Sequence, residues 1–297
     1  MFACVGLEAG YLKRYIEEMA MKTLAWTALL FCGQLYAQAP ERIVVLDAAT
    51  ADTLQALGVA NSIIALPKAQ MPAYLAPVSR EQVVDTGGLD KLAYGQLRQL
   101  KPDAIYAPNL NAKTKSALQQ IAPTQVLAFH PQQYWQDLER NTLAVAVPHG
   151  KQSLAQQSLT HLQQQISTVR QEINQDNRSV VVLEHNQGHY RWEAQAAYQG
   201  LLYGVLQIKR PVNLPTQPTE VTQAQLQQWQ ADTLWVIDIS GAKQQQSVDV
   251  SVLEEAARGT PALANERIKM LSPSHWTQTA VGLQGLQLQV DDVARMW

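Results

Sequence analysis

Aromatic and cationic side chains fall in or near the loops that follow the predicted strands of this chain. The aromatic members are Tyr134, Trp192, Tyr198 and Trp276, and the cationic members are Lys68, Lys113 and Arg191. Aromatic side chains can form the apolar walls of a small-molecule site, and an arginine can bind a carboxylate through two parallel hydrogen bonds. The alternative is ordinary core packing for each aromatic residue and a solvated surface for each lysine. These residues are therefore candidates for a small-molecule binding site.

The histidines raise the separate question of a metal or haem site. His185 and His189 are separated by a predicted glycine turn, and the loop after the first predicted strand offers Asp47 but no histidine. A capture site for bare zinc or manganese would need ligands from both regions. We therefore predict no metal site. Asp47 remains a candidate ligand-binding residue. Haem stays open, because His130, Tyr134, His185 and His275 are each of a type that can serve as an axial ligand.

Composition and motifs exclude several other classes of protein. The sequence contains no G-x-S-x-G, H-E-x-x-H or G-x-G-x-x-G signature, so we predict that it is not an enzyme and has no cofactor of its own. A net charge of −2 with 16% charged residues gives no sign of a nucleic-acid partner.

Strands and helices alternate along the chain, which predicts an α/β fold with mainly parallel sheets. Arg42–Asp47 and Ser62–Leu66 are the first predicted strands, and Ile268–Leu271 is the last. Helices are predicted over Ala197–Leu206 and Leu283–Met296. Asn186-Gln187-Gly188 predicts a hairpin turn. Ligands of such sheets bind at the carboxyl ends of the strands, which is where most of the candidate residues fall.

One segment of the sequence occurs twice. Residues 96–108 (QLRQLKPDAIYAP) and residues 225–237 (QLQQWQADTLWVI) both predict a short amphipathic helix, a tight turn ending in Asp, and a buried strand. Two copies so far apart indicate two lobes built on one plan, with a cleft between them.

A long amphipathic helix is predicted between the two halves. From Gln152 to Asn174, apolar residues recur at helical spacing without an internal Gly or Pro. We interpret it as a rigid connector, the alternative being an ordinary helix of one lobe. The predicted organisation is an N-terminal lobe over 40–150, a bridging helix over 151–176 and a C-terminal lobe over 177–297.

The N-terminal region predicts export to the periplasm. Residues 21–39 have a short positive start at Met21-Lys22, an apolar stretch and small residues before Pro40. We therefore assign 1–39 to a cleavable signal region, with Met21 as a possible true start. Cys4 and Cys32 both lie within it, so removal would leave a mature protein without thiols.

Beyond these features the chain resembles the periplasmic solute-binding proteins with a helical backbone, which deliver ferric siderophores, haem or cobalamin to ABC importers. Arg42–Gly58 (RIVVLDAATADTLQALG) resembles the opening strand and helix of that family, and Leu97–Ala107 its L-x-x-L-x-P-D strand entry. Ala262–Ser272, followed by Ser274-His275-Trp276, resembles the closing strand and its loop. The resemblance implies two Rossmann-like lobes joined by one long helix.

Within the family the chain is most similar to the ferric-citrate and siderophore branch, through Leu118–Pro123 and Gln195–Leu206. The resemblance implies a monomeric protein that captures a ferric siderophore or ferric citrate for an inner-membrane ABC permease. Haem and cobalamin are the alternative ligands. The iron would arrive already chelated, so the protein would need no metal ligands.

The chain departs from the family at two positions. The family carries a Glu at the start of each repeat helix, and these carboxylates dock on importer arginines; here the matching residues are Gly95 and Ala224. Asp90 and Glu220 are acidic residues nearby. The departure leaves the fold unaffected and opens a second hypothesis, an accessory or sequestering periplasmic protein that does not dock on a standard importer.

Overall fold

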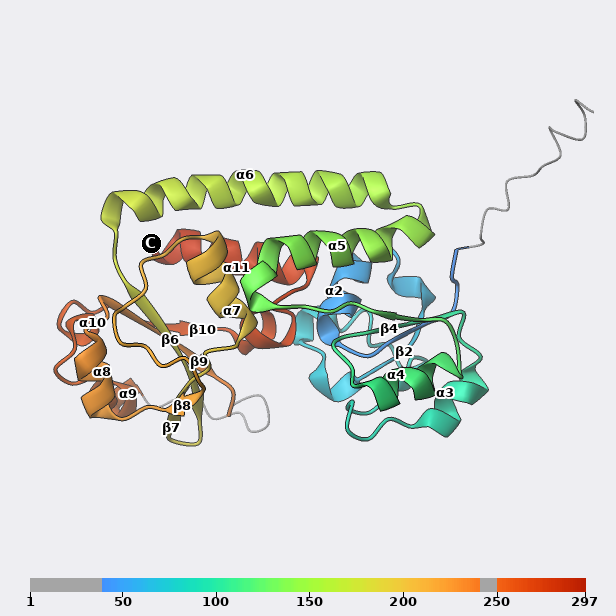
Figure 1. Cartoon of the computed structure of the whole chain (residues 1–297), viewed down its shortest axis with the longest axis horizontal. Coiled ribbons are helices and arrows are strands. Elements are labelled where there is room, and N and C mark those ends of the chain that lie inside the picture. Colours follow the sequence, from blue (N-terminus) through green and yellow to red (C-terminus); the bar gives the residue numbers. More distant parts are fainter. Residues whose placement is uncertain (1–38, 241–249) are drawn as a thin grey trace, which may run out of the picture. The chain divides into compact units, whose positions relative to one another are not determined.

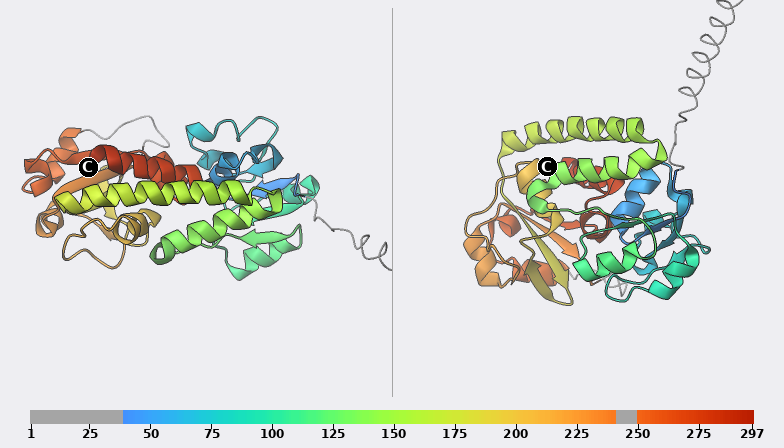
Figure 2. Two further views of the ribbon diagram at one scale, coloured as in Figure 1. Left: turned by 90° about the horizontal axis from the view of Figure 1, so that it is seen from above. Right: turned by 45° about the vertical axis from the view of Figure 1, so that its right-hand side comes forward.

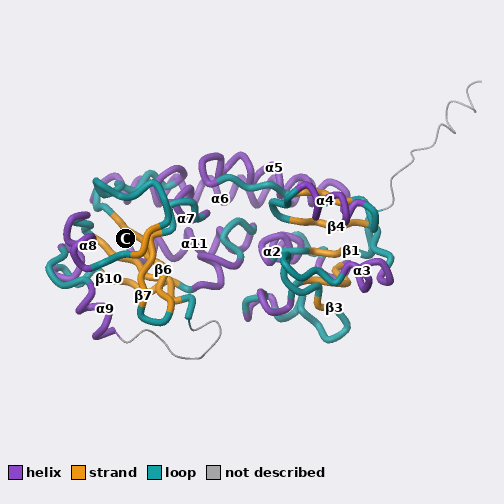
Figure 3. The backbone as a smooth tube through the Cα atoms, turned by 60° about the horizontal axis from the view of Figure 1, so that its bottom comes forward, coloured by secondary structure: helices purple, strands orange, loops and turns teal. Residues whose placement is uncertain are grey.

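The computed structural model describes residues 39–240 and 250–297. The predicted signal region up to residue 38 and both cysteines lie outside these ranges. The described chain folds into two α/β lobes, each with its own five-stranded sheet, and Figure 3 shows the strands gathered in two groups. No helix in the described ranges is long and apolar enough to cross a membrane.

The N-terminal lobe is built on an all-parallel sheet of order β3-β2-β1-β4-β5. Its strands are β1 (Ile43–Val45), β2 (Ile63–Leu66), β3 (Val84–Asp85), β4 (Ala104–Ala107) and β5 (Thr124–Val126). The helices that follow them are α2 (Ala48–Ala56), α3 (Tyr94–Leu100), α4 (Ala112–Gln119) and α5 (Tyr134–Ala146). Nearly continuous apolar strands such as β1, buried at every residue, are typical of a parallel sheet that is covered on both faces.

The C-terminal lobe has a mixed sheet of order β10-β9-β6-β7-β8. Strands β6 (Val180–Asn186), β9 (Thr233–Asp238) and β10 (Ile268–Leu271) are parallel, whereas β7 (His189–Trp192) and β8 (Thr219–Glu220) are antiparallel additions at one edge. Gln187 and Gly188 have positive φ values of 51° and 89°, so the predicted hairpin turn is confirmed. The helices of the C-terminal lobe are α7 (Ala197–Gln199), α8 (Gln223–Trp229), α9 (Val250–Ala256), α10 (Pro261–Ala264) and α11 (Leu283–Met296).

Two segments of this lobe are wound as π-helix. Residues Gly200–Val205 continue from α7, and residues Ser274–Gln278 precede α11. The sequence predicted one regular helix from Ala197 to Leu206; the structure keeps only its first turn as α-helix. Short π-helical segments occur frequently at functional sites, because the wider turn displaces backbone and side chains from the regular helical path.

The long helix α6 (Gln152–Asp176) connects the lobes (Figure 1). It ends in Asn177, whose left-handed conformation (φ 50°) stops the helix. Leu159, Leu162, Ile166 and Val169 are buried on its inner face, which packs against α5 and α11. Seen from above, α6 runs between these two helices (Figure 2). The predicted fold class, two α/β lobes joined by one long helix, is confirmed.

A buried carboxylate ties the N-terminal lobe to the last helix. Asp52 of α2 is fully buried, and its Oδ2 accepts hydrogen bonds from the backbone N–H groups of Gln284 (2.8 Å) and Gly285 (3.2 Å) at the start of α11. Its Oδ1 accepts a hydrogen bond from the Tyr74 hydroxyl, which also lies 2.6 Å from Thr279 Oγ1. The carboxylate therefore caps a helix of the other half of the chain.

Candidate functional site

A cavity of about 260 Å³ lies at the carboxyl edge of the N-terminal sheet. Its wall combines residues of the loops after β1, β3, β4 and β5 with residues of α2 and one face of α5, among them Asp47, Leu89, Asn109, Phe129, Asn141 and Val145. Val281, from the segment that precedes α11, completes it. Parallel strands bring their carboxyl ends to one edge, which explains why loops distant in sequence meet here.

Hydrogen bonds hold the loops of this cavity in place. Asp47 caps α2: its carboxylate accepts from the Thr50 backbone N–H (2.7 Å) and from the Thr50 hydroxyl (2.8 Å). Burial raises the pKa of Asp47, although the bonds from Thr50 act in the opposite direction. The Asn109 side chain bridges two strands, accepting from Phe129 N (2.8 Å) and donating to Phe129 O (3.1 Å). These hydrogen bonds connect the loops that form the cavity wall.

A histidine next to this wall is oriented by a buried carboxylate. Asp137 is fully buried; its Oδ2 accepts from the His130 backbone N–H and lies 2.8 Å from His130 Nδ1, while Arg140 pairs with Oδ1. Burial acts to raise the pKa of Asp137, but the hydrogen bonds from His130 and Arg140 hold it below its usual range. The His130 side chain is 56% exposed. In the described part of the chain its Nε2 has no hydrogen-bond partner.

The aromatic candidates are placed differently. Trp192 and Trp276 are fully buried, and Tyr134 and Tyr198 are exposed by only 2% and 1%. Trp192 packs against Trp229 and Trp276 against Trp235, with ring centroids 6.1 and 5.9 Å apart. The structure thus gives these four side chains core packing, which the sequence left open as the alternative. In an alternating strand such as β7, Trp192 faces inward while its neighbour Arg191 faces out.

The cationic candidates are scattered. The Lys68 ammonium group donates a hydrogen bond to the Arg80 carbonyl (3.1 Å), and Lys113 is exposed near the start of α4. Arg191 is 52% exposed and pairs with Glu193 at 2.8 Å. Of the charged residues named from sequence, only Asp47 belongs to the cavity wall.

The remaining histidine candidates are held by carboxylates. His275 Nε2 lies 2.6 Å from Asp292 Oδ2, and the side chain of His275 is 12% exposed. His185 Nδ1 lies 3.1 Å from Asp238, while its Nε2 accepts from the Gly188 backbone N–H (2.9 Å). The described residues contain no group of three or more His, Cys, Asp or Glu side chains placed to hold a metal ion.

The amides and the phenylalanine of the cavity wall are not among the residues predicted from the sequence. Asn109, Phe129 and Asn141 carry no charge, and a search for cations, tryptophans and tyrosines passes over them. Asn141 lies on α5, a helix that the sequence analysis did not predict. The signal was present, since Leu138, Thr142 and Val145 recur at helical spacing and are all buried.

Comparison with known proteins identifies the family. The sequence profile of the family described as "Periplasmic binding protein" matches residues 43–274. This chain belongs to that family. The resemblance noted from its motifs is therefore confirmed.

Curated relatives in this family bind siderophores. The petrobactin-binding protein YclQ of Bacillus subtilis is 22% identical over 258 residues, covering 86% of this chain and 81% of its own length. The ferric-anguibactin-binding protein FatB of Vibrio anguillarum is 22% identical over 268 residues, covering 86% and 82%.

Solved structures share the fold. The iron uptake ABC transporter substrate-binding protein PiuA of Streptococcus pneumoniae superposes with a TM-score of 0.79 at 25% identity, covering 88% of this chain and 94% of its own. The siderophore-binding protein BauB, bound to two acinetobactin molecules and ferric iron, gives a TM-score of 0.78 at 23% identity and covers 87% and 93%. All of these relatives are named as binding proteins, and PiuA as the substrate-binding protein of an ABC transporter.

Proposed function

We propose that this protein captures a ferric siderophore or ferric citrate between the carboxyl edges of its two sheets, in the periplasm, and delivers it to an ABC importer. The observation that carries the proposal is the cavity at the N-terminal sheet edge, whose wall also includes Val281 from the segment before α11. At about 260 Å³ the cavity is smaller than a typical ligand site of roughly 300–1,000 Å³. A bulky chelate would therefore occupy it with one part and contact the C-terminal lobe with another.

The chemistry of the wall supports a chelate over a bare ion. Phe129 and Leu89 offer apolar surface, and Asn109 and Asn141 offer amide groups. The one carboxylate of the wall, Asp47, is engaged in capping α2. Exposed donors outside the wall are the His130 imidazole, which follows Phe129 in the chain, and, on the C-terminal lobe, the Arg191 guanidinium. We assign ligand contact to Asp47, His130 and Arg191 among the residues named from sequence.

Haem and cobalamin remain the alternative cargoes. Of the four residues of a type that could ligate haem iron, His130 alone has an exposed side chain, since Tyr134 is buried and the side chains of His185 and His275 are only 8% and 12% exposed. A haem complex would therefore depend on His130. Substitution of His130 by Ala would abolish the Soret shift of bound haem and would weaken a ferric chelate only moderately.

The direct test is quenching of tryptophan fluorescence by ferric citrate, a ferric hydroxamate, a ferric catecholate, haem and cyanocobalamin. We expect saturable quenching by a ferric chelate with a sub-micromolar dissociation constant, roughly −8 kcal/mol or better. Leu89→Glu adds a carboxylate to the wall at a residue that is already 38% exposed. It should weaken an anionic chelate by about tenfold, or about 1.4 kcal/mol.

The matched control is Val212→Glu, because Val212 is an exposed aliphatic residue (69%) that is not part of the wall. This variant should bind as the unaltered protein does. If no ligand of the panel quenches the fluorescence, the proposal is wrong. If Leu89→Glu and Val212→Glu lose affinity equally, the ligand does not bind at the cavity.

Delivery to an importer needs a test of its own. Gly95 and Ala224 are each the second residue of their helix, α3 and α8, and both are exposed. A carboxylate at either position would thus face solvent. Stimulation of a siderophore importer's ATPase by the unaltered protein would support delivery, and the accessory hypothesis would then fail. Stimulation only after Gly95→Glu and Ala224→Glu together would favour the accessory hypothesis instead.

A further inference from the structure

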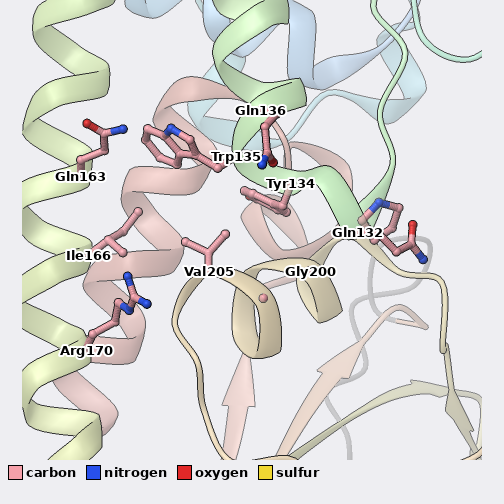
Figure 4. A pocket seen from close by; sticks show the side chains of 11 residues that line it. Gln132, Tyr134, Trp135, Gln136, Gln163, Ile166, Arg170, Gly200 and Val205 are labelled. Atoms are coloured by element: carbon pink, nitrogen blue, oxygen red, sulfur yellow. The ribbon is translucent and has the colours of Figure 1, made fainter.

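A second cavity, of about 420 Å³, lies beside the linker helix α6 and shares no wall residue with the first (Figure 4). Its wall comes from three elements: the start of α5 with the turn before it, the inner side of α6, and the π-helical segment Gly200–Val205. The first belongs to the N-terminal lobe and the last to the C-terminal lobe. This cavity therefore touches both lobes and the helix that joins them.

The charge of this wall has one sign. Arg170 of α6 points its guanidinium group toward the cavity, and no acidic residue contributes to the wall (Figure 4). Within the described ranges Arg170 is partly buried and makes neither an ion pair nor a hydrogen bond. Arg178, which is also partly buried, pairs with Asp176. A partly buried guanidinium without a partner is a ready site for an anion, because its donors are arranged as a planar fork.

The rest of the wall suits an organic body. Gln132, Gln136 and Gln163 supply amide groups, while Trp135, Ile166 and Val205 supply aromatic and aliphatic surface. Trp135 also has an indole nitrogen that is covered from solvent and lacks a hydrogen-bond partner. The cavity lies within the usual size range of small-molecule sites, and its wall combines apolar surface with amide groups and one cation.

Two glycines of the π-helical segment shape the opening. A Cβ at Gly200 would lie 2.1 Å from the Pro131 carbonyl oxygen, so the absence of a side chain lets this segment pack directly on the turn before α5. A Cβ at Gly204 would meet nothing within 4 Å. Gly200 thus holds the two lobes together at one wall of the cavity, and Gly204 leaves the space beside it open.

We propose that this cavity binds a small organic carboxylate, with Arg170 holding the carboxylate group and the Trp135, Ile166 and Val205 surfaces holding the apolar body. Because its wall belongs to both lobes, an occupant stabilises one relative arrangement of them. On the proposed function, this occupant changes the affinity for the chelate, and the chelate changes the affinity for the carboxylate by the same factor.

The test uses benzoate and its neutral isostere benzamide as probes on the whole ¹⁵N-labelled protein. The indole N–H signal of Trp135, assigned with Trp135→Phe, reports binding. We expect millimolar or tighter binding of benzoate, at least about tenfold tighter than that of benzamide, as one charge-assisted hydrogen-bonding pair predicts. Equal binding of the two probes, or no response to either at millimolar concentration, would overturn the proposal.

Variants of the cation locate the site. Arg170→Gln should remove the preference for benzoate, and Arg170→Lys should keep part of it, since a point charge replaces the fork. The control is Arg98→Gln, an exposed arginine of α3 that belongs to neither cavity, and it should leave benzoate binding unchanged. An unaltered preference in a folded Arg170→Gln protein would contradict the assignment.

The coupling to the cleft is measured separately, as the affinity for a ferric chelate with and without saturating benzoate. A shift that disappears in Arg170→Gln supports coupling, and an unchanged affinity refutes it. If no ferric chelate binds at all, the proposed function fails while the benzoate result stands, so the two failures are distinguishable.

Discussion

Asp103 in the N-terminal lobe and Asp232 in the C-terminal lobe occupy the same place in the two copies of the repeat. Each follows a helix that ends in a left-handed residue, Lys101 or Gln230, both with φ 47°. Asp103 accepts hydrogen bonds from the backbone N–H groups of Glu41 and Arg42, just before β1. Asp232 accepts from the Ser179 backbone N–H and hydroxyl, just before β6. In each lobe the aspartate of the repeat therefore holds the start of one strand, β1 or β6. The strand of the repeat itself, β4 or β9, pairs with that strand.

The lobes differ in what surrounds this common unit. Asp103 is exposed, whereas Asp232 is partly buried. The N-terminal sheet is parallel throughout and has a cavity at its carboxyl edge, while the C-terminal sheet adds the antiparallel strands β7 and β8. The C-terminal lobe also buries Trp192, Trp229, Trp235 and Trp276. A shared repeat thus specifies the framework of a lobe, and the residues added around it make the two lobes different.

The largest expected effect is on the free energy of unfolding, and it tests whether the two lobes unfold independently. Asp52 of the N-terminal lobe caps α11, and one hydrophobic core includes residues of both lobes. Asp52→Ala leaves the buried N–H groups of Gln284 and Gly285 and the Tyr74 hydroxyl without their acceptor. We expect a loss of about 3 kcal/mol in the free energy of unfolding, measured by urea titration.

The comparison control is Asp52→Asn, which keeps an acceptor oxygen and should lose less than Asp52→Ala. The transition should stay single in both variants, because the shared core couples the lobes. Two separate transitions in the unaltered protein would show that the lobes are autonomous, against this interpretation.

The same carboxylate predicts a pH dependence. Burial raises the pKa of Asp52 from 3.8 to about 6, although hydrogen bonds from Tyr74, Gly285 and Gln284 act to lower it. The folded protein therefore binds this proton more tightly than the unfolded chain. The stabilising contribution is complete below about pH 4 and is lost as the pH rises through about 6, and the difference corresponds to about 3 kcal/mol.

Urea titrations between pH 4 and 7 measure this dependence. Asp52→Asn, which does not titrate, should remove the decline attributable to this residue. If the slope of stability against pH is identical in the variant and the unaltered protein, Asp52 is not the titrating group.

A smaller effect on the free energy of unfolding should distinguish Asp232 from Asp103, the two aspartates of the repeat. Although burial acts to raise it, the hydrogen bonds from Ser179 hold the pKa of Asp232 below its usual range. Asp232→Ala should lower the free energy of unfolding by about 2 kcal/mol, because a partly buried N–H and hydroxyl lose their acceptor. Asp103→Ala should cost about half of that or less, since water can replace the exposed carboxylate. Equal losses would mean that burial does not distinguish the lobes.

The smallest effects are expected at the second residue of each repeat helix. Gly95→Glu replaces a glycine that has open space around its Cβ position, in a helix without a side-chain cap. It should raise the free energy of unfolding by about 1 kcal/mol, through helix propensity and the favourable charge at a helix start. Ala224→Glu should change it by less than about 0.5 kcal/mol, because α8 already has a capping box with Thr222 and Gln225. A larger gain at Ala224 would contradict this account.

Much of the framework was predictable from local patterns. The bounds of β10 and α11 match the predicted 268–271 and 283–296, and the linker helix was recognised from its apolar spacing alone. These features depend on side-chain periodicity within one element, which a single sequence displays directly. Helix α5 was not predicted, and the π-helical winding after α7 carried no recognisable local signal.

The sequence by itself determined the repeat, the alternation of strands and helices, the linker and the family, because each depends on neighbouring residues. Only the tertiary structure decided which polar and aromatic side chains face a cavity. Trp192 and Arg191 are adjacent, yet alternation along a strand buries one and exposes the other. Asn109, Phe129 and Val281 meet through loop packing, and Asp52 reaches Gln284 across the chain. Such contacts depend on how the sheets and helices stack, which no local spacing encodes.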